Sequence, residues 1–191
     1  MSKVLAEVSA RHVHLSRRDM DALFGLGSEL TFKRALSQPG QFSCEERVDV
    51  IGPKRELKGV AVLGPLRADT QVELSLTDAR AIGVDAPIRE SGRVSGSGAC
   101  TIVGPAGAVD LAEGVVAAKR HIHLDPATAA QFGLVDQQIV SVRLDTPERA
   151  LVLGDVEVRV RDDFAPALHI DTDEGNAAGI LNSEAYGEIL K

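Results

Sequence analysis

Arg-His-Val-His-Leu, at residues 11–15, returns almost unchanged as Arg-His-Ile-His-Leu at residues 120–124. Both copies continue into a short polar segment that ends in Phe-Gly, at residues 24–25 and 132–133. Four of the five histidines lie in these two copies, and the fifth is His169. Because the whole local pattern is repeated, we expect two related structural units, and we look for the chemistry of the chain in its histidines.

The two histidines of each copy are expected to project from one face of a strand, since side chains two residues apart point the same way. Two imidazoles on one strand face provide half of a site for zinc or a similar divalent ion. For a single pair, two surface histidines on an edge strand would be the simpler explanation. The duplication favours metal, and His169, on another alternating apolar run, could complete one of the two sites.

The rest of the pattern predicts a mainly β protein with short helices. Ser16 and Asp125 are expected helix N-caps, and a third helix is expected at residues 173–178. Apolar β segments divided by Gly and Pro include residues 47–51, 59–63, 70–76, 108–112, 115–119, 138–144, 149–153 and 156–161. No helix is long enough for a regular parallel crossover. We therefore predict two β-barrels capped by short α-helices.

Residues 11–118 are assigned to a central barrel, and residues 1–10 with 119–191 to a second, discontinuous barrel. This assignment places the N-terminal strand in the barrel made by the second half of the chain, since barrel order need not match chain order. Residues 28–46 are polar and are expected to be irregular, and a short tail is expected after the last helix.

The composition is that of an ordinary globular protein, with 44% apolar and 26% charged residues. Aromatic residues make up 3% and Trp is absent, which argues against stacking-based recognition of single-stranded nucleic acid. The net charge of −7 argues against binding to a phosphate backbone. No apolar run is long enough for a membrane span, and a strand-like run begins so early that we expect no targeting segment.

The two cysteines, Cys44 and Cys100, follow no metal or redox spacing. We expect both to be ordinary thiols in a reducing cytoplasm. Cys44 is followed by two glutamates, which disfavour a reactive thiolate.

Two further side chains are weaker candidates for a site. Glu73 falls on the polar face of the alternating run Thr70–Leu76, where it could be a third metal ligand, although such a residue is more often solvated. Arg67 lies in a turn-rich connection. Near a metal its guanidinium would suit a tetrahedral oxyanion, and elsewhere it would be a surface charge.

Three acidic residues follow His169, namely Asp171, Asp173 and Glu174. They could accept hydrogen bonds from ligating imidazoles. For Asp173 and Glu174, a solvated helix N-terminus is the alternative.

Several blocks of the sequence, taken in order, resemble the PduL-type phosphate acyltransferases, the phosphotransacylases first associated with propanediol-degrading microcompartments. The blocks lie at residues 11–16, 39–41, 52–54, 63–73, 120–123 and 169–174, and the resemblance extends from about residue 4 to residue 180. It implies two β-barrels with a dinuclear zinc site between them. By this resemblance the site residues are His12, His14 and Glu73 for one zinc, His121, His123 and His169 for the other, Arg67 for phosphate, and Leu63 and Asn176 for coenzyme A.

The reaction implied by the resemblance converts acyl-CoA and inorganic phosphate into acyl phosphate and CoA, reversibly, with acetyl or propanoyl as the acyl group. We expect direct attack of phosphate, because neither cysteine stands in an activating context. Family members resident in microcompartments carry an N-terminal extension that this chain lacks, so we expect a cytoplasmic enzyme. A homodimer is left open.

Two other functions are alternatives. A binuclear metallohydrolase commonly carries His-x-His-x-Asp-His, but Leu-Ser follows the first His pair and Leu-Asp the second. A (β/α)₈ hydrolase would also need about 250 residues. A cupin-like, non-catalytic metal binder uses His-x-His on barrel strands, but we find no matching Glu and downstream His in each copy.

Overall fold

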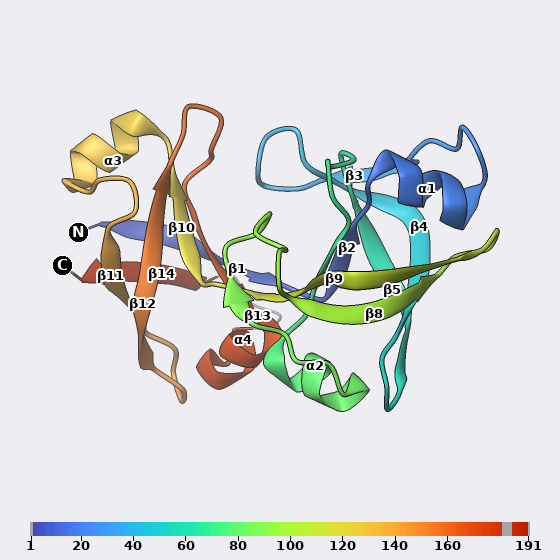
Figure 1. Cartoon of the computed structure of the whole chain (residues 1–191). Coiled ribbons are helices and arrows are strands. Elements are labelled where there is room, and N and C mark those ends of the chain that lie inside the picture. Colours follow the sequence, from blue (N-terminus) through green and yellow to red (C-terminus); the bar gives the residue numbers. More distant parts are fainter. Residues whose placement is uncertain (1, 181–184, 191) are drawn as a thin grey trace. The chain divides into compact units, whose positions relative to one another are not determined.

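A computed structural model describes residues 2–180 and 185–190 of the chain, which form a mainly β protein with four short helices. The chain divides into two compact units. The C-terminal unit comprises Met1–Ala10 and Lys119–Lys191, and the central unit comprises Arg11–Ala118. In Figure 1 the blue N-terminal strand accordingly lies among the yellow to red strands of the C-terminal unit.

The central unit contains a closed ring of six strands. Its elements are β2 (His12–His14), α1 (Arg17–Phe24), β3 (Phe32–Ala35), β4 (Phe42–Ile51), β5 (Glu56–Gly64), β6 (Gln71–Glu73), α2 (Leu76–Ile82), β7 (Ile88–Arg89), β8 (Gly98–Val103) and β9 (Ala108–Ala118). The ring runs β4-β5-β2-β6-β9-β8 and closes because β8 pairs with both β9 and β4. The short strands β3 and β7 extend it beside β4 and β9.

The C-terminal unit is a second closed barrel. Its elements are β1 (Lys3–Ser9), β10 (His121–Leu124), α3 (Pro126–Phe132), β11 (Ile139–Leu144), β12 (Leu151–Val160), β13 (Ala167–Asp171), α4 (Thr172–Ala178) and β14 (Ala185–Leu190). The barrel order is β1-β13-β10-β12-β11-β14, so β1 closes the ring between β13 and β14. Two β-barrels with short helices confirm the predicted fold class.

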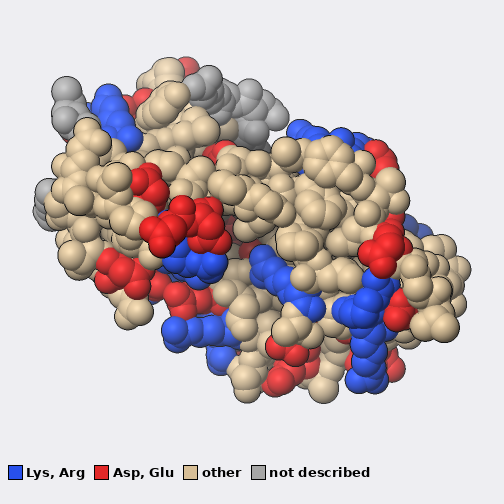
Figure 2. Space-filling model, turned by 90° about the horizontal axis from the view of Figure 1, so that it is seen from above, with Lys and Arg blue, Asp and Glu red and all other residues tan. Residues whose placement is uncertain are grey.

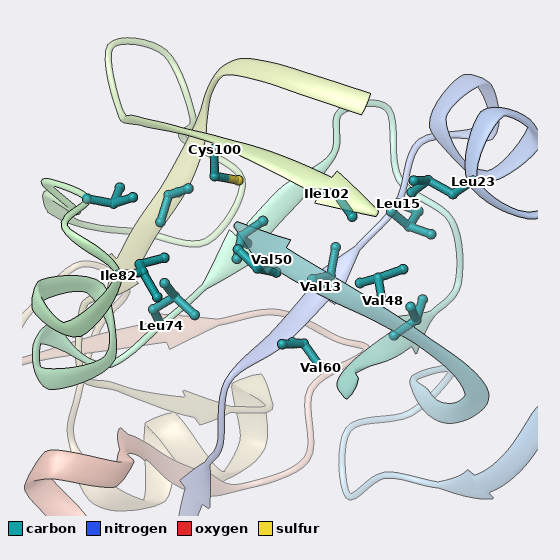
Figure 3. Close-up of a cluster of buried hydrophobic side chains, with 14 of the residues drawn as sticks. Val13, Leu15, Leu23, Val48, Val50, Val60, Leu74, Ile82, Cys100 and Ile102 are labelled. Carbon is teal, nitrogen blue, oxygen red and sulfur yellow. The ribbon is translucent and has the colours of Figure 1, made fainter. Parts of the chain in front are cut away.

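Each barrel has its own apolar core, and the His-x-His strands contribute to both. On β2, Val13 is buried in the core, where Figure 3 shows it among Val48, Val50 and Val60. On β10, Ile122 is buried in the other core. Since neighbouring side chains on a strand point to opposite faces, burial of these apolar residues turns the histidines beside them to the other face.

Several local predictions were wrong, for identifiable reasons. The segment 28–46, expected to be irregular, contains β3 and the start of β4, and the expected tail contains β14. The run 70–76 is a strand only as far as Glu73, because Ser75 caps α2 by accepting a hydrogen bond from the Asp78 backbone. Two pairs of expected strands are continuous: β9 bends at Gly114, where φ is 145°, and β12 passes through Asp155, where φ is 51°.

Charged groups of both signs are mixed on the face drawn in Figure 2, where Lys and Arg side chains lie beside Asp and Glu. The acidic excess of the chain is therefore not gathered into one patch on that face. Among the helices of the described residues, none has both the length and the apolar character needed to cross a membrane.

Candidate metal centres

The first candidate centre lies in the central unit, where β6 runs antiparallel to β2 and places Glu73 directly opposite His12. His12 Nε2 lies 3.5 Å from Glu73 Oε2, and His14 Nε2 lies 3.9 Å from Glu73 Oε1. All three side chains are buried. The structure thus brings Glu73 to a pair of histidines from which it is distant in sequence, and we name these three residues the central triad.

The second candidate centre lies in the C-terminal unit and is built in the same way. Strand β13 runs antiparallel to β10 and places His169 directly opposite His121. The ring centroid of His123 lies 4.5 Å from that of His121 and 4.7 Å from that of His169. These three histidines are named the C-terminal triad.

Both triads have a geometry that suits a metal ion. In each, one potential ligand atom per residue lies within 4.8 Å of the others. Tetrahedral zinc, with Zn–N bonds of about 2.0–2.1 Å, holds its ligand atoms about 3.3–3.5 Å apart, so small side-chain rotations would suffice. Both ring nitrogens of the buried His123 lack a hydrogen-bond partner among the described residues. Buried polar atoms are rarely left without a partner, and a bound cation would provide one for one of these two nitrogens.

The protonation states also suit metal binding. Burial, aided by the charges of His12 and Arg67, lowers the pKa of His14 to about 3. Burial, aided by the charges of His121 and His169, lowers the pKa of His123 to about 2. Both imidazoles are therefore neutral near pH 7, the form that binds metal.

Glu73 is held as a carboxylate. Burial by itself would raise the pKa of Glu73, but its interactions with His12, His14 and the Ser91 hydroxyl outweigh burial and lower it. The central triad therefore combines two imidazoles with one anionic oxygen donor, a set that zinc accepts.

Arg67 is connected to the central triad through a serine that sequence reasoning missed. The Arg67 backbone N–H donates to the carbonyl oxygen of Leu15, just beyond β2. Its Nη1 donates to Ser91 Oγ at 2.9 Å, and Ser91 Oγ donates to Glu73 Oε1 at 2.7 Å. Ser91 lies in a Pro/Ser/Gly-rich passage, and its local sequence carries no signal of a site.

The C-terminal triad has two neighbours that were also missed. Glu7 on β1 lies opposite His169 in the parallel β1·β13 pair, with its Oε2 3.6 Å from His169 Nδ1. The Phe164 ring stacks on His123 with the centroids 3.8 Å apart. Only the strand pairing, which the sequence does not reveal, brings Glu7 to this position.

The acidic residues after His169 serve helix α4. Asp171 is its N-cap, and Asp171 and Glu174 form a reciprocal capping box. Glu174 also pairs with Arg120, Nε to Oε1, at 2.8 Å. Asp171, considered above as a partner for imidazole, is thus engaged with the helix backbone.

The two residues expected to contact coenzyme A are on different units. Leu63 is half-buried near the end of β5, in the central unit. Asn176 is exposed on α4, in the C-terminal unit. Each lies on a regular element, and each residue is at least partly exposed to solvent.

The chain matches the family model described as phosphate propanoyltransferase over residues 5–181. It is 49% identical over 183 residues to the phosphate propanoyltransferase of Shewanella putrefaciens, which covers 96% of this chain and 86% of the relative. Identity to that of Thermotoga maritima is 49% over 180 residues, covering 94% and 85% of the two chains. Identity to that of Listeria monocytogenes is 47% over 188 residues, covering 98% and 87%. The region matched by the family model contains both triads and Arg67.

Proposed function

Because this chain belongs to the phosphate propanoyltransferase family, we propose that it transfers a short acyl group between coenzyme A and inorganic phosphate. The substrates in one direction are propanoyl-CoA or acetyl-CoA and phosphate, and the products are the acyl phosphate and CoA. The observation that carries the proposal is the family match over residues 5–181, which spans both triads.

Two zinc ions are proposed as resident cofactors. His12, His14 and Glu73 would hold one ion, and His121, His123 and His169 the other. When bound, zinc supplies a Lewis acid for substrate oxygens and a soft partner for a thiolate sulfur. The neutral imidazoles of His14 and His123 and the ionised Glu73 support this assignment, since these three groups are in the form that ligates a metal without prior proton loss.

Arg67 is proposed to bind the phosphate. A guanidinium presents paired N–H donors that match two phosphate oxygens. One nitrogen of Arg67 is already held by Ser91, which restrains the side chain before substrate arrives. Phosphate is an anion at neutral pH, so it needs positioning and partial neutralisation more than it needs a strong base.

The acyl group is proposed to pass directly from sulfur to oxygen. A phosphate oxygen attacks the thioester carbonyl carbon, a C–O bond forms, the C–S bond breaks, and CoA leaves as a thiolate that takes up a proton from solvent. A cysteine nucleophile is disfavoured on two grounds. Cys44 and Cys100 are buried, and burial, with Glu46 beside Cys44, raises their pKa values to about 11 and about 12.

Leu63 and Asn176 are proposed to contact coenzyme A, on the resemblance to the family. The preference between acetyl and propanoyl is harder to predict. The two groups differ by one methylene, which contributes only about 1–3 kcal/mol of discrimination free energy in a pocket. The relatives named above are propanoyltransferases, which makes propanoyl-CoA the first substrate to test.

The test is CoA release from propanoyl-CoA and acetyl-CoA, with and without phosphate, by metal-replete protein. His121→Ala should abolish phosphate-dependent release. Asp145→Ala, which removes only an exposed ion pair with Arg143 in the same unit, should retain it. Equal release without phosphate would instead identify a hydrolase, and no release at all would favour a non-catalytic metal binder.

A further inference from the structure

Ser91 makes three hydrogen bonds that together join the residue proposed for phosphate to a residue proposed for metal. Its Oγ accepts from Arg67 Nη1 at 2.9 Å and from Gln71 Nε2 at 3.0 Å. The same oxygen donates to Glu73 Oε1 at 2.7 Å. A hydroxyl has one proton and two lone pairs, so all of its hydrogen-bonding capacity is used.

Gln71 provides a second contact to the same carboxylate oxygen, and its orientation is determined. The Gly92 backbone N–H donates to Gln71 Oε1 at 2.6 Å, which identifies that atom as the amide oxygen. The amide nitrogen therefore faces Glu73 Oε1, to which it donates at 2.6 Å. Two donors thus hold Oε1, and Oε2 is left on the side of His12, whose Nε2 lies 3.5 Å away.

Backbone pairing holds Ser91 in this place. Strand β9 pairs in parallel with β6, where Glu73 lies opposite Val116, and also with β7, where Ile88 lies opposite Ala117. The Gly92 bond to Gln71 then fixes the chain directly after Ser91. One strand therefore sets the position of the carboxylate and of the segment that carries the serine.

We propose that Ser91 is a positioning residue that fixes the Glu73 carboxylate for the metal and the Arg67 guanidinium for phosphate in a single arrangement, with Gln71 as its support. The part that concerns Arg67 rests on the proposed function, and the part that concerns Glu73 does not. In this arrangement the Ser91 proton is committed to Glu73, so the hydroxyl is not a nucleophile.

Ser91→Ala is the test, with Ser91→Thr as the variant that keeps the hydroxyl. Ser97→Ala is a matched control, since Ser97 is a half-buried serine of the same segment whose Oγ bonds only to backbone, donating to Val94 and accepting from Gly114. Two quantities are measured on zinc-loaded protein. The first is the KM for phosphate, with the KM for propanoyl-CoA as its reference, and the second is the rate of zinc transfer to the chelator 4-(2-pyridylazo)resorcinol.

In Ser91→Ala we expect the KM for phosphate to rise about tenfold or more while the KM for propanoyl-CoA stays unchanged. We expect one of the zinc ions to transfer about 10–100-fold faster, as for other residues that orient a metal ligand. Ser91→Thr should restore both quantities toward wild type, and Ser97→Ala should change neither.

Wild-type values of both quantities in Ser91→Ala would overturn the proposal. A collapse of kcat with both KM values and zinc transfer unchanged would also overturn it, because Ser91 would then act on the reacting atoms. If the wild-type protein shows no phosphate-dependent turnover, the proposed function fails, and faster zinc transfer in Ser91→Ala still tests the link to Glu73 by itself.

Discussion

The two barrels share one plan and differ in the third residue of each triad. Around the central ring, β5·β2 and β6·β9 are parallel and the other four pairs antiparallel. Around the C-terminal ring, the corresponding pairs β12·β10 and β13·β1 are parallel, and the other four pairs are antiparallel. The third residue is opposite the first His in both, but it is Glu73 in one and His169 in the other. The fold therefore fixes where the third residue of each triad lies and leaves its side-chain chemistry open.

The chain order explains how the two barrels are joined. In the central barrel, β6 pairs in parallel with β9, which is the last strand of that unit. In the C-terminal barrel, β13 pairs in parallel with β1, which is the first strand of the chain. Strand β1 runs into β2 as β9 runs into β10. Each His-x-His strand therefore begins just after the chain has left the other barrel.

The surroundings of the third residue differ as much as the residue does. Glu73 is anionic and receives hydrogen bonds from Gln71 and Ser91. His169 has a carboxylate beside it instead, from Glu7 on β1, while the matching position on β9 is the apolar Val116. The negative charge is thus inside the central triad and outside the C-terminal triad.

Glu73→His would make the central triad resemble the C-terminal one, and we expect the largest effect from it. The change removes the anionic oxygen proposed to bind metal, and with it the acceptor that Ser91 and Gln71 share. Phosphate-dependent CoA release should fall by more than about 100-fold, since even residues that only orient a ligand contribute 10–100-fold.

Metal analysis gives this variant its control, because the C-terminal triad lies in the other unit and should keep its ion. If activity survived Glu73→His, the carboxylate would be replaceable and the difference between the barrels would carry no function.

Glu7→Val places beside His169 the residue type that the central barrel has at the matching position, Val116. We expect its effect to be smaller than that of Glu73→His. Without a carboxylate near Nδ1, His169 would lose a group that orients its ring. We expect zinc to transfer from this triad to a chelator about 10–100-fold faster, with the central triad unchanged. Glu7→Gln, which keeps a hydrogen-bond acceptor, should lie between Glu7→Val and wild type. Identical zinc transfer in all three proteins would show that Glu7 does not orient His169.

Features that depend only on neighbouring residues, namely helix caps and the alternation of side chains along a strand, were predicted correctly. Ser16 and Asp125 cap helices as expected, and the apolar residues between the histidines face the cores. The fold class and the family were also confirmed, and with them the prediction of an acyltransferase. By contrast, β3 and β14 were missed because they are stabilised by pairing with β4, β1 and β11, which the sequence does not reveal.

The same limit applies to the site. Alternation predicts that two histidines share a face, but not that Glu73 or His169 lies opposite, since that depends on strand register. The residue pattern offered Glu73 and His169 only as candidates, and the resemblance to the family assigned each of them to a site. Ser91 and Glu7 were missed because pairing with β9 and β13 brings them into place. The two zinc ions stay predictions, and so do the residues proposed to bind zinc, phosphate and coenzyme A.

The smallest effect is expected at the arginine that precedes each His pair. Arg11 pairs with Asp78 of α2 at 2.8 Å, and Arg120 pairs with Glu174 of α4 at the same distance. Arg120 is the less exposed arginine, 32% against 47% for its side chain. Burial raises the pKa of Glu174, so this carboxylate depends more on its partner. Arg120→Ala should therefore cost about 1 kcal/mol of unfolding free energy and Arg11→Ala about 0.5 kcal/mol or less.

Urea unfolding of the two alanine variants, each compared with its Lys counterpart, measures this difference. Lys keeps the charge without the guanidinium fork, so it should recover most of the loss at Arg11 and less at Arg120, where Nε makes the contact. Equal losses at the two sites would mean that the capping box holds Glu174 without help. The barrels would then be equivalent in their helix contacts and would differ only at the triads.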